Sequence, residues 1–286
     1  MVAVPRFSDT ISAVSAVMTQ HITSRQNVRV KEAAKLRLGR QRERQGRFVI
    51  DGAREILRAI DAGIEIVEAF VCESLATADE AARAVARLSE ASAVRATVTE
   101  EVFEKLCFGE RAGGVLAIAK TPKRTLDQLK LPAAPLVAVI EGVEKPGNVG
   151  AVLRSADGAG VDAVVIADPR TDLFNPNTIR ASLGTVFGAN VCAATSEEVL
   201  AWVRGLNLPM FAARPDAELL YMEADYRMGA AIVLGSEADG LSHKWQGADV
   251  TGVRLPMRGI ADSLNVSATA AVLFYEARRQ RHGGPR

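Results

Sequence analysis

Near-continuous apolar strands dominate the second half of this sequence and limit the folds open to it. The stretches LVAVIEGV (136–143), DAVVIAD (162–168) and AAIVLGSE (230–237) are largely apolar, and a helical stretch at 151–160 separates the first two. A strand that is apolar on both faces is buried on both faces, which is typical of a parallel sheet covered by helices. Further short strands are expected at 189–194, 209–214 and 250–256. We therefore predict an α/β domain with a mostly parallel sheet.

The first half predicts a second, smaller α/β unit. From Phe48 the sequence predicts a strand, a helix and a second strand, with Gly52 and Gly63 at the turns. Helices are then expected at 79–90 and 99–109, followed by a strand at 113–120. A proline- and lysine-containing segment then reads as a linker. The expected organisation is a basic helical extension without strands at 1–45, a small α/β domain at 46–121, a linker at 122–135 and the larger domain at 136–286.

Composition excludes several classes of protein. The 286 residues allow two domains, and 48% hydrophobic with 24% charged residues is typical of a folded, soluble chain. No apolar run approaches the roughly 20 residues of a membrane span, and no secretory signal is apparent. The cysteines and histidines are few and scattered, so neither a disulfide framework nor a metal site is expected. We expect a cytoplasmic protein without a metal ion.

One segment of the N-terminal region is strongly basic. Between Arg29 and Arg47, eight Lys or Arg residues face only Glu32 and Glu43. A solvated helix face explains such a run, but the one-sided excess favours a polyanionic partner. Aromatic residues make up only 5% of the chain, so a stacking platform for single-stranded bases is not indicated.

Three unusual loops follow strands of the larger domain: EKPGNVG (144–150), GSEADGLS (235–242) and LPMRGIADSLN (255–265). Ligands bind outside the carboxyl ends of strands in open α/β sheets. Each loop also has an ordinary explanation, with Asn148 and either Ser263 or Asn265 as helix N-caps and Gly and Asp as turn residues. A dinucleotide site is the main rival, because Asp168 lies about twenty residues beyond the first loop, but no GxGxxG pattern is present.

Together, these loops resemble a known set of motifs. NVGAVLRSA (148–156), IVLGSEADGLS (232–242) and LPMRGIADSLNVSATAAVLFYE (255–276) are similar, in that order, to the three signature motifs of the SPOUT-class (SpoU/TrmH) RNA 2′-O-ribose methyltransferases. The resemblance covers roughly residues 136–279. Residues 24–60 are similar to the L30e/L7Ae-like substrate-binding domain that precedes the catalytic domain in many members. Within the family, the chain resembles actinobacterial enzymes that act on 23S rRNA, including those conferring resistance to antibiotics of the avilamycin or thiostrepton type.

The resemblance implies a fold and a cofactor. In that family the C-terminal segment forms a deep trefoil knot that holds S-adenosylmethionine, and the enzymes are homodimers with active sites at the interface. An adenine ring needs a flat apolar slot with main-chain partners. The residues that would line the cofactor site are Leu234, Gly235, Leu255, Met257, Ile260 and Leu264.

The resemblance also implies roles for polar residues. Arg154 would contact the target phosphate or hydroxyl, Asn148 and Asn265 would orient the ribose or Arg154, Ser263 would bind the adjacent phosphate or Arg154, and Glu237 would fix the loops. The expected RNA-binding residues are Arg25, Asn27, Arg29, Lys35, Arg37 and Arg40, to which the basic C-terminal residues Arg278, Arg279 and Arg281 would add.

Several alternatives stay open at the level of sequence. The residues identify neither the methylated nucleotide nor the general base. They also do not determine whether the target is ribosomal or transfer RNA, or whether the substrate is naked RNA or an assembled ribosomal subunit. A non-catalytic RNA-binding protein is a second hypothesis, although all five polar residues of the motifs are retained.

Overall fold

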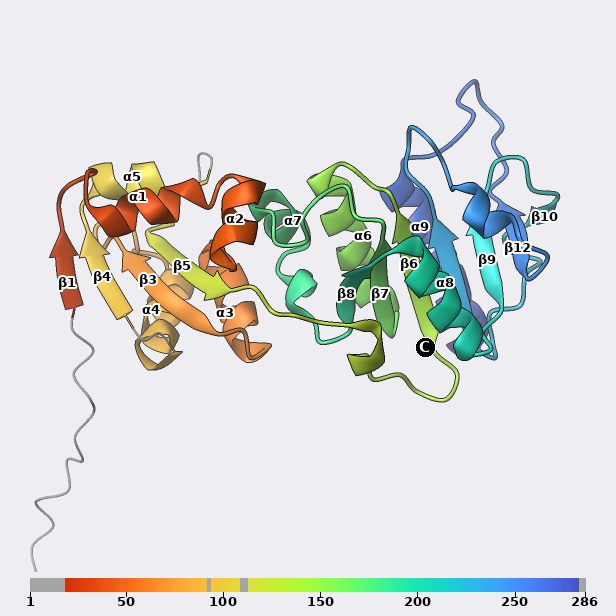
Figure 1. Ribbon diagram of the computed structural model, residues 1–286, viewed down its shortest axis with the longest axis horizontal. Coiled ribbons are helices and arrows are strands. Elements are labelled where there is room, and N and C mark those ends of the chain that lie inside the picture. The colour runs from red at the N-terminus through yellow and green to blue at the C-terminus, as the bar shows by residue number, and fades with distance from the viewer. Residues whose placement is uncertain (1–18, 92–93, 109–112, 283–286) are drawn as a thin grey trace, which may run out of the picture.

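The computed structural model describes residues 19–91, 94–108 and 113–282, so the first part of the predicted N-terminal extension, residues 1–18, lies outside the described residues. Figure 1 shows two α/β units side by side along the long axis of the molecule, each built on its own sheet. The segment that joins them contains a short 3₁₀ helix, η1 (Leu126–Gln128).

The first unit contains a five-stranded sheet in the order β1-β4-β3-β5-β2. Its strands β1, β4 and β3 are mutually parallel, and β5 pairs antiparallel with both β3 and β2. Its strands are β1 (Thr19–Ile22), β2 (Arg47–Asp51), β3 (Ile66–Val71), β4 (Val94–Val98) and β5 (Val115–Lys120). Its helices are α1 (Val28–Lys35), α2 (Gly39–Gln45), α3 (Ala53–Asp61), α4 (Asp79–Ala91) and α5 (Glu100–Leu106). The helices expected near 79–90 and 99–109 are thus present.

Residues 19–45 differ from the expected strand-free extension. Thr19–Ile22 form β1, which pairs with β4 at the edge of the first sheet. The buried side chains of Val30, Ala33 and Leu36 pack in the same apolar cluster as Phe103 of α5. The prediction of no strand before residue 46 is therefore wrong. The residues of β1, TQHI, include a single apolar one, Ile22, so the strand carries almost no apolar pattern.

The second unit contains a seven-stranded sheet in the order β10-β12-β9-β11-β6-β7-β8, in which every strand pair is parallel. Its strands are β6 (Leu136–Glu141), β7 (Ala163–Ala167), β8 (Val191–Ala194), β9 (Met210–Ala213), β10 (Leu219–Leu220), β11 (Ala230–Leu234) and β12 (Val250–Arg254). The central strands β6, β7 and β11 are buried along their whole length. This confirms the predicted α/β fold with a mostly parallel sheet.

Helices cover both faces of this sheet. The helices of the unit are α6 (Pro146–Ala159), α7 (Pro176–Ala181), α8 (Ser196–Gly205) and α9 (Val266–His282), with the 3₁₀ turns η2 (Thr185–Phe187) and η3 (His243–Gln246). Ala138 and Ile140 of β6 join the apolar cluster that includes α6 and α9, whereas Val137 and Val139 join the cluster that includes α8. The alternation places α6 and α9 on one face and α8 on the other.

The two units share an apolar and ionic contact. The ring of Phe48 in β2 stacks on that of Phe174 at 4.6 Å between centroids, and Phe187 lies 6.0 Å away. Arg42 of α2 is only 4% exposed and forms an ion pair with Asp172 in the loop after β7. A buried guanidinium needs such a partner, because an unpaired buried charge is costly. Arg42 therefore belongs to the contact between the units and not to a solvated basic face.

Candidate active site

The three loops singled out in the sequence meet at the carboxyl edge of the seven-stranded sheet. The first leads from β6 into α6, the 235–242 loop follows β11, and the third joins β12 to α9. Since all seven strands are parallel, their carboxyl ends lie at one edge, and segments more than 100 residues apart become neighbours there.

Hydrogen bonds join one side chain from each loop. Glu237 Oε1 accepts from Asn148 Nδ2 and, at 3.0 Å, from Asn265 Nδ2. The amide of Asn265 also lies 3.4 Å from Asn148 Oδ1. Both Asn148 and Asn265 thus present their amide nitrogens to one carboxylate, and the three side chains form a single polar cluster.

Asn148 does not cap its helix. α6 begins at Pro146, with Lys145 in the N-cap position, so Asn148 lies within the first turn. The ordinary explanation for this asparagine is therefore wrong, and its side chain is free to serve Glu237. The neighbouring Gly150 has a packing role: a Cβ there would lie 2.6 Å from the Cβ of Ala181, so glycine allows α6 and α7 to approach closely.

Asn265 serves as both cap and site residue. Its Oδ1 accepts from the backbone N–H of Ser267 at 2.9 Å and from the Ser267 hydroxyl at 2.6 Å, which satisfies the open end of α9. With its oxygen used in this way, its Nδ2 is directed to Glu237. The helix cap fixes the orientation of the amide in the polar cluster.

Arg154 and Ser263 lie outside this hydrogen-bonded cluster. Arg154 is exposed on α6 and makes no side-chain hydrogen bond or ion pair within the part of the chain that the structure describes. Ser263 is exposed, donates to Asp262 Oδ1 at 3.3 Å and lines the adjacent cavity. Both side chains are therefore available to a ligand.

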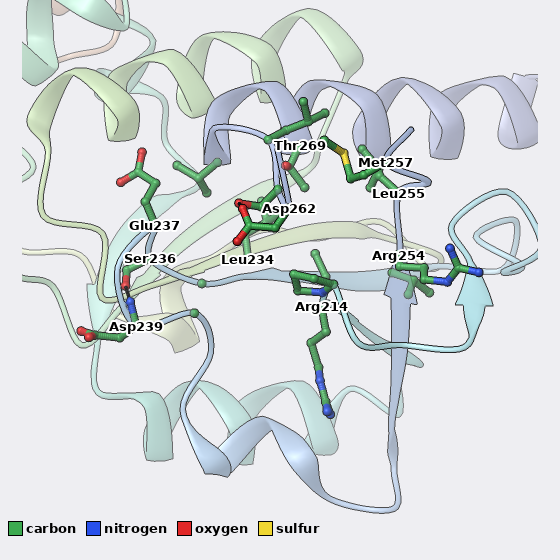
Figure 2. Close-up of a pocket in the computed structure, with 18 of the residues that line it drawn as sticks. Arg214, Leu234, Ser236, Glu237, Asp239, Arg254, Leu255, Met257, Asp262 and Thr269 are labelled. Carbon is green, nitrogen blue, oxygen red and sulfur yellow. Dashed lines mark hydrogen bonds between the residues drawn. The ribbon is translucent and has the colours of Figure 1, made fainter. Parts of the chain in front are cut away.

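A cavity of about 360 Å³ adjoins the cluster and is shown in Figure 2. Five of the six predicted cofactor residues line it: Leu234, Gly235, Leu255, Met257 and Leu264. Ile260 does not line it and is fully exposed. Three lining residues that the sequence analysis missed are Arg214, Asp262 and Thr269, which come from the end of β9, the third loop and α9.

The 235–242 loop is compact at its base. A Cβ at Gly235 would lie 2.3 Å from the carbonyl carbon of Gly240, so only glycine fits there. Ser236 and Gly240 exchange two backbone hydrogen bonds of 3.1 Å, and Ser236 Oγ accepts from the N–H of Asp239 at 3.0 Å. The loop that carries Glu237 into the site therefore behaves as one closed turn.

An arginine that the sequence analysis missed connects three of the loops at this edge. Arg170, in the loop after β7, donates to Glu144 Oε1 and Asp239 Oδ2, each at 2.7 Å. The hydrogen bonds that Arg170 donates to Glu144 and Asp239 raise the pKa of its guanidinium, so it stays protonated. Its position just past the carboxyl end of a strand was the only signal for it in the sequence.

Most of the predicted RNA-binding residues have partners within the protein. Asn27 caps α1 through the N–H of Arg29, Arg25 pairs with Glu104 at 2.8 Å, and Lys35 pairs with Glu32 at 2.5 Å. Arg29 pairs with Glu68 and lies over the ring of Phe70, while Arg37 donates to two backbone carbonyls. Of the six, only Arg40 makes no side-chain hydrogen bond or ion pair among the described residues.

The charge count therefore overstates the free positive charge of this region. Within the described chain, the exposed cations between Arg29 and Arg47 that make no ion pair or side-chain hydrogen bond are Lys31, Arg40, Arg44 and Arg47. The C-terminal arginines are also engaged: Arg278 and Arg281 donate to backbone carbonyls, and Arg279 pairs with Glu276 at 2.8 Å. The basic surface is smaller than the sequence suggests.

The described residues contain neither a metal-binding cluster nor a membrane-spanning helix. Over those residues, no His, Cys, Asp and Glu side chains gather in a group of three or more that would hold a metal ion. No helix in the described ranges has the length and apolar character needed to cross a membrane.

Comparison with known proteins places the site in a family. Residues 135–275 match the model of the SpoU rRNA Methylase family, and residues 27–117 match an MRM3-like substrate binding domain. A 23S rRNA (uridine(2479)-2′-O)-methyltransferase from Streptomyces viridochromogenes is 29% identical over 93% of this chain and 94% of its own length.

Two solved structures are similar over nearly their whole length. A crystal structure of an RNA 2′-O ribose methyltransferase is 45% identical, with a TM-score of 0.80, over 91% of this chain and 99% of its own. The SpoU methyltransferase AviRb from Streptomyces viridochromogenes, solved with AdoMet, is 26% identical with a TM-score of 0.80, over 91% of this chain and 100% of its own.

Proposed function

The chain belongs to the SpoU rRNA Methylase family, and from this premise we infer that it is an S-adenosylmethionine-dependent methyltransferase acting on a ribose 2′-hydroxyl of RNA. One observation carries the inference: Asn148, Glu237 and Asn265 form a hydrogen-bonded cluster beside a cavity of about 360 Å³. We take 23S rRNA as the substrate, since the Streptomyces viridochromogenes relative is named for that RNA.

The cavity suits S-adenosylmethionine. Its volume lies within the roughly 300–1,000 Å³ typical of ligand pockets. Leu234, Leu255 and Leu264 offer apolar walls for adenine, and the backbone of the 235–242 loop offers main-chain partners. When bound, this cofactor supplies a methyl group on a positively charged sulfur, and the carboxylates of Glu237 and Asp262 on the cavity wall are compatible with that charge.

The polar cluster is positioned to hold the ribose. Methyl transfer to an oxygen requires the hydroxyl oxygen, the methyl carbon and the sulfur to be aligned, so orientation is the main task of the protein. Glu237 holds the amides of Asn148 and Asn265 in fixed directions. We assign to the two asparagines the orientation of the 2′-hydroxyl at the mouth of the cavity.

Arg154 and Ser263 are assigned to the RNA backbone. Arg154 is exposed and without a partner among the described side chains, as a residue awaiting a phosphate or hydroxyl would be. Because a guanidinium stays protonated in proteins, we assign it contact with the target phosphate or 2′-hydroxyl and not proton abstraction. Ser263 would contact the adjacent phosphate.

The division into domains is part of the same proposal. We assign catalysis to residues 136–286, with the C-terminal segment threaded as a deep trefoil knot, and RNA binding to an L30e/L7Ae-like domain at 46–121, joined by the linker 122–135. Residues 19–45 are added to the RNA-binding domain, because β1 and α1 pack on its sheet. The match of residues 27–117 to a substrate binding domain supports this assignment.

Assembly, location and biological role complete the proposal. We assign a homodimer in which α9, with its exposed Tyr275, belongs to the interface, and a cytoplasmic location, where ribosomal RNA is available. We extend the proposal to resistance against a ribosome-targeting antibiotic, because several relatives are 23S rRNA methyltransferases of Streptomyces species.

Transfer of a tritiated methyl group to total RNA, followed by mapping of the labelled nucleotide, tests the proposal. We expect label in 23S rRNA, carried by one nucleotide. Label confined to transfer RNA would change the assigned substrate. Absence of label from every RNA, with RNA binding intact, would favour a non-catalytic RNA-binding protein.

A further inference from the structure

A buried carboxylate lies beneath the 235–242 loop. Glu141 is the last residue of β6 and is only 5% exposed. Moving a carboxylate out of water is costly, so a buried one persists only where hydrogen bonds or opposite charges compensate for the lost solvation. None of the roles assigned to the family motifs includes this residue.

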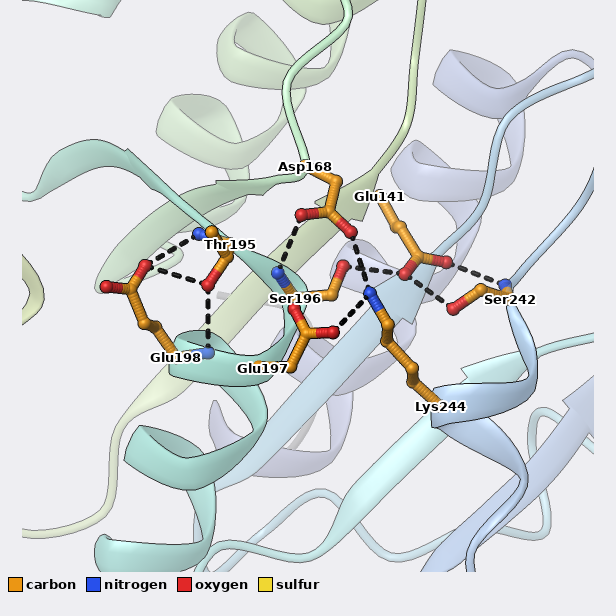
Figure 3. A network of polar contacts seen from close by, with 8 residues as sticks. All are labelled: Glu141, Asp168, Thr195, Ser196, Glu197, Glu198, Ser242 and Lys244. Carbon is orange, nitrogen blue, oxygen red and sulfur yellow. Dashed lines mark hydrogen bonds and ion pairs between the residues drawn. The ribbon is translucent and has the colours of Figure 1, made fainter.

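Glu141 is compensated by two serines from distant segments, as Figure 3 shows. Its Oε1 accepts from the hydroxyls of Ser196 at 2.7 Å and Ser242 at 2.8 Å, and its Oε2 accepts from the backbone N–H of Ser242 at 2.7 Å. Burial by itself would raise the pKa of Glu141, but these hydrogen bonds outweigh it and hold the pKa below its ordinary value. The carboxylate is therefore ionised at neutral pH.

The two serines belong to different structures. Ser196 is fully buried at the start of α8, on the far side of the sheet from α6. Ser242 is the last residue of the 235–242 loop. Glu141 thus ties the end of this loop to β6 and α8, in the rigid interior of the unit.

The hydrogen bonds between Ser242 and Glu141 affect the site because of the shape of the 235–242 loop. Gly235 lies so close to Gly240 that the loop is closed at its base, and Ser236 and Gly240 are paired through backbone hydrogen bonds. Ser242 follows this closed turn by two residues, so we expect a displacement of Ser242 to be passed to Glu237 and to the backbone that lines the cavity.

We propose that Glu141 is a positioning residue, which fixes the 235–242 loop and thereby both Glu237 and the wall of the cofactor cavity. The proposal rests on the proposed function for the identity of the ligand. The anchoring itself rests only on the hydrogen bonds of Glu141.

The two serines provide a matched pair of variants. Ser242→Ala and Ser196→Ala each remove one hydroxyl donor from the same oxygen of Glu141, but only Ser242 belongs to the loop. We expect similar small falls in melting temperature for the two. Ser242→Ala is expected to weaken S-adenosylmethionine binding, measured by calorimetry, by about three- to tenfold, as the loss of one hydrogen bond of ordinary net strength predicts. Ser196→Ala should stay within about twofold of the unmodified protein.

Hydrogen exchange gives a readout that does not depend on the cofactor. Ser242→Ala and Glu141→Ala are expected to accelerate amide exchange across residues 235–242, whereas Ser196→Ala should leave it unchanged. Glu141→Gln should restore slow exchange in part, because a glutamine amide still accepts from the loop. Equal effects of the two serine variants, or slow exchange in a folded Glu141→Ala variant, would overturn the proposal.

Failure of the proposed function would look different. In that case the unmodified protein would not bind S-adenosylmethionine at all, while the exchange measurements would still report on the anchor. Slow exchange in the unmodified loop and fast exchange in Ser242→Ala, without cofactor binding, would retain the anchor and reject the ligand.

Discussion

Asn265 donates to Glu237 across 3.0 Å with the same amide whose oxygen caps α9 through the N–H of Ser267 at 2.9 Å. One side chain therefore joins the start of a helix to the site, and the geometry of the helix end determines the direction of the amide nitrogen. This double use explains why a cluster of polar residues precedes an apolar helix.

The two uses of Asn265 are separable by substitution. Serine caps a helix about as well as asparagine but has no amide to donate to Glu237. Asn265→Ser should keep a melting temperature near that of the unmodified protein and lose methyl transfer by on the order of 100-fold. Asn265→Ala should lose activity equally and about 1 kcal/mol of stability as well. Full activity in a folded Asn265→Ser variant would remove Asn265 from the site.

Arg154 should matter for transfer but not for folding. Its side chain is exposed and has no partner among the described residues, so Arg154→Ala should leave the urea midpoint unchanged. Loss of its contact with the RNA should lower kcat/KM for RNA by about 100- to 1,000-fold, with S-adenosylmethionine affinity unchanged. Arg204→Ala, which removes an exposed arginine paired with Asp249 at 2.8 Å, is the matched control and should keep full activity.

The exposed cations of the first unit should set the salt dependence of RNA binding. Each phosphate contact contributes roughly 0.7–0.9 to the slope of log affinity against log salt concentration. Replacing Lys31, Arg40, Arg44 and Arg47 with glutamine should therefore flatten the slope by about 3. Arg87→Gln is the control, because this arginine is paired with Asp61 on a different helix, and its slope should not change. An unchanged slope in the fourfold variant would move the RNA elsewhere.

Glu141 should contribute to the loss of stability in acid. Its ordinary pKa is near 4.5, and its hydrogen bonds outweigh burial and place the folded value lower. A carboxylate with a depressed folded pKa stabilises the protein fully above its ordinary pKa, and this contribution is lost as pH falls through the folded value. Unfolding free energies of Glu141→Gln should therefore vary less below pH 4.5 than those of the unmodified protein. Parallel curves for the two proteins would contradict the anchoring of this carboxylate.

The central architecture was predictable because its signal is local. The strands β6, β7 and β11 are continuous apolar runs, and such runs predict a sheet buried on both faces. By contrast, β1 is an edge strand in which Ile22 is the single apolar residue, and its partner β4 lies more than 70 residues further along the chain. In the sequence, Arg42 is one of eight cations in a basic segment, and no neighbouring residue indicates that it pairs with Asp172.

Some residues of the site were likewise predictable from the sequence, and others were not. The three sequence motifs carry Asn148, Glu237 and Asn265, which the fold brings into hydrogen-bond contact, and five of the six cofactor residues implied by the resemblance line the cavity. It did not indicate Arg170 or Glu141, because their partners lie 26 to 101 residues away and no pattern of spacing marks them. Contacts made only by the folded sheet edge have no signature in a single sequence.

The position of the transferred methyl group tests the central claim most directly. A 2′-O-methyl group prevents attack of the ribose hydroxyl on the adjacent phosphodiester, so labelled RNA treated with alkali should yield its label in a resistant dinucleotide. We predict that all tritium transferred by the unmodified protein appears in this dinucleotide, and that Asn265→Ser yields almost none. Label in ordinary mononucleotides would place the methyl group on a base and contradict the account of a ribose-directed site.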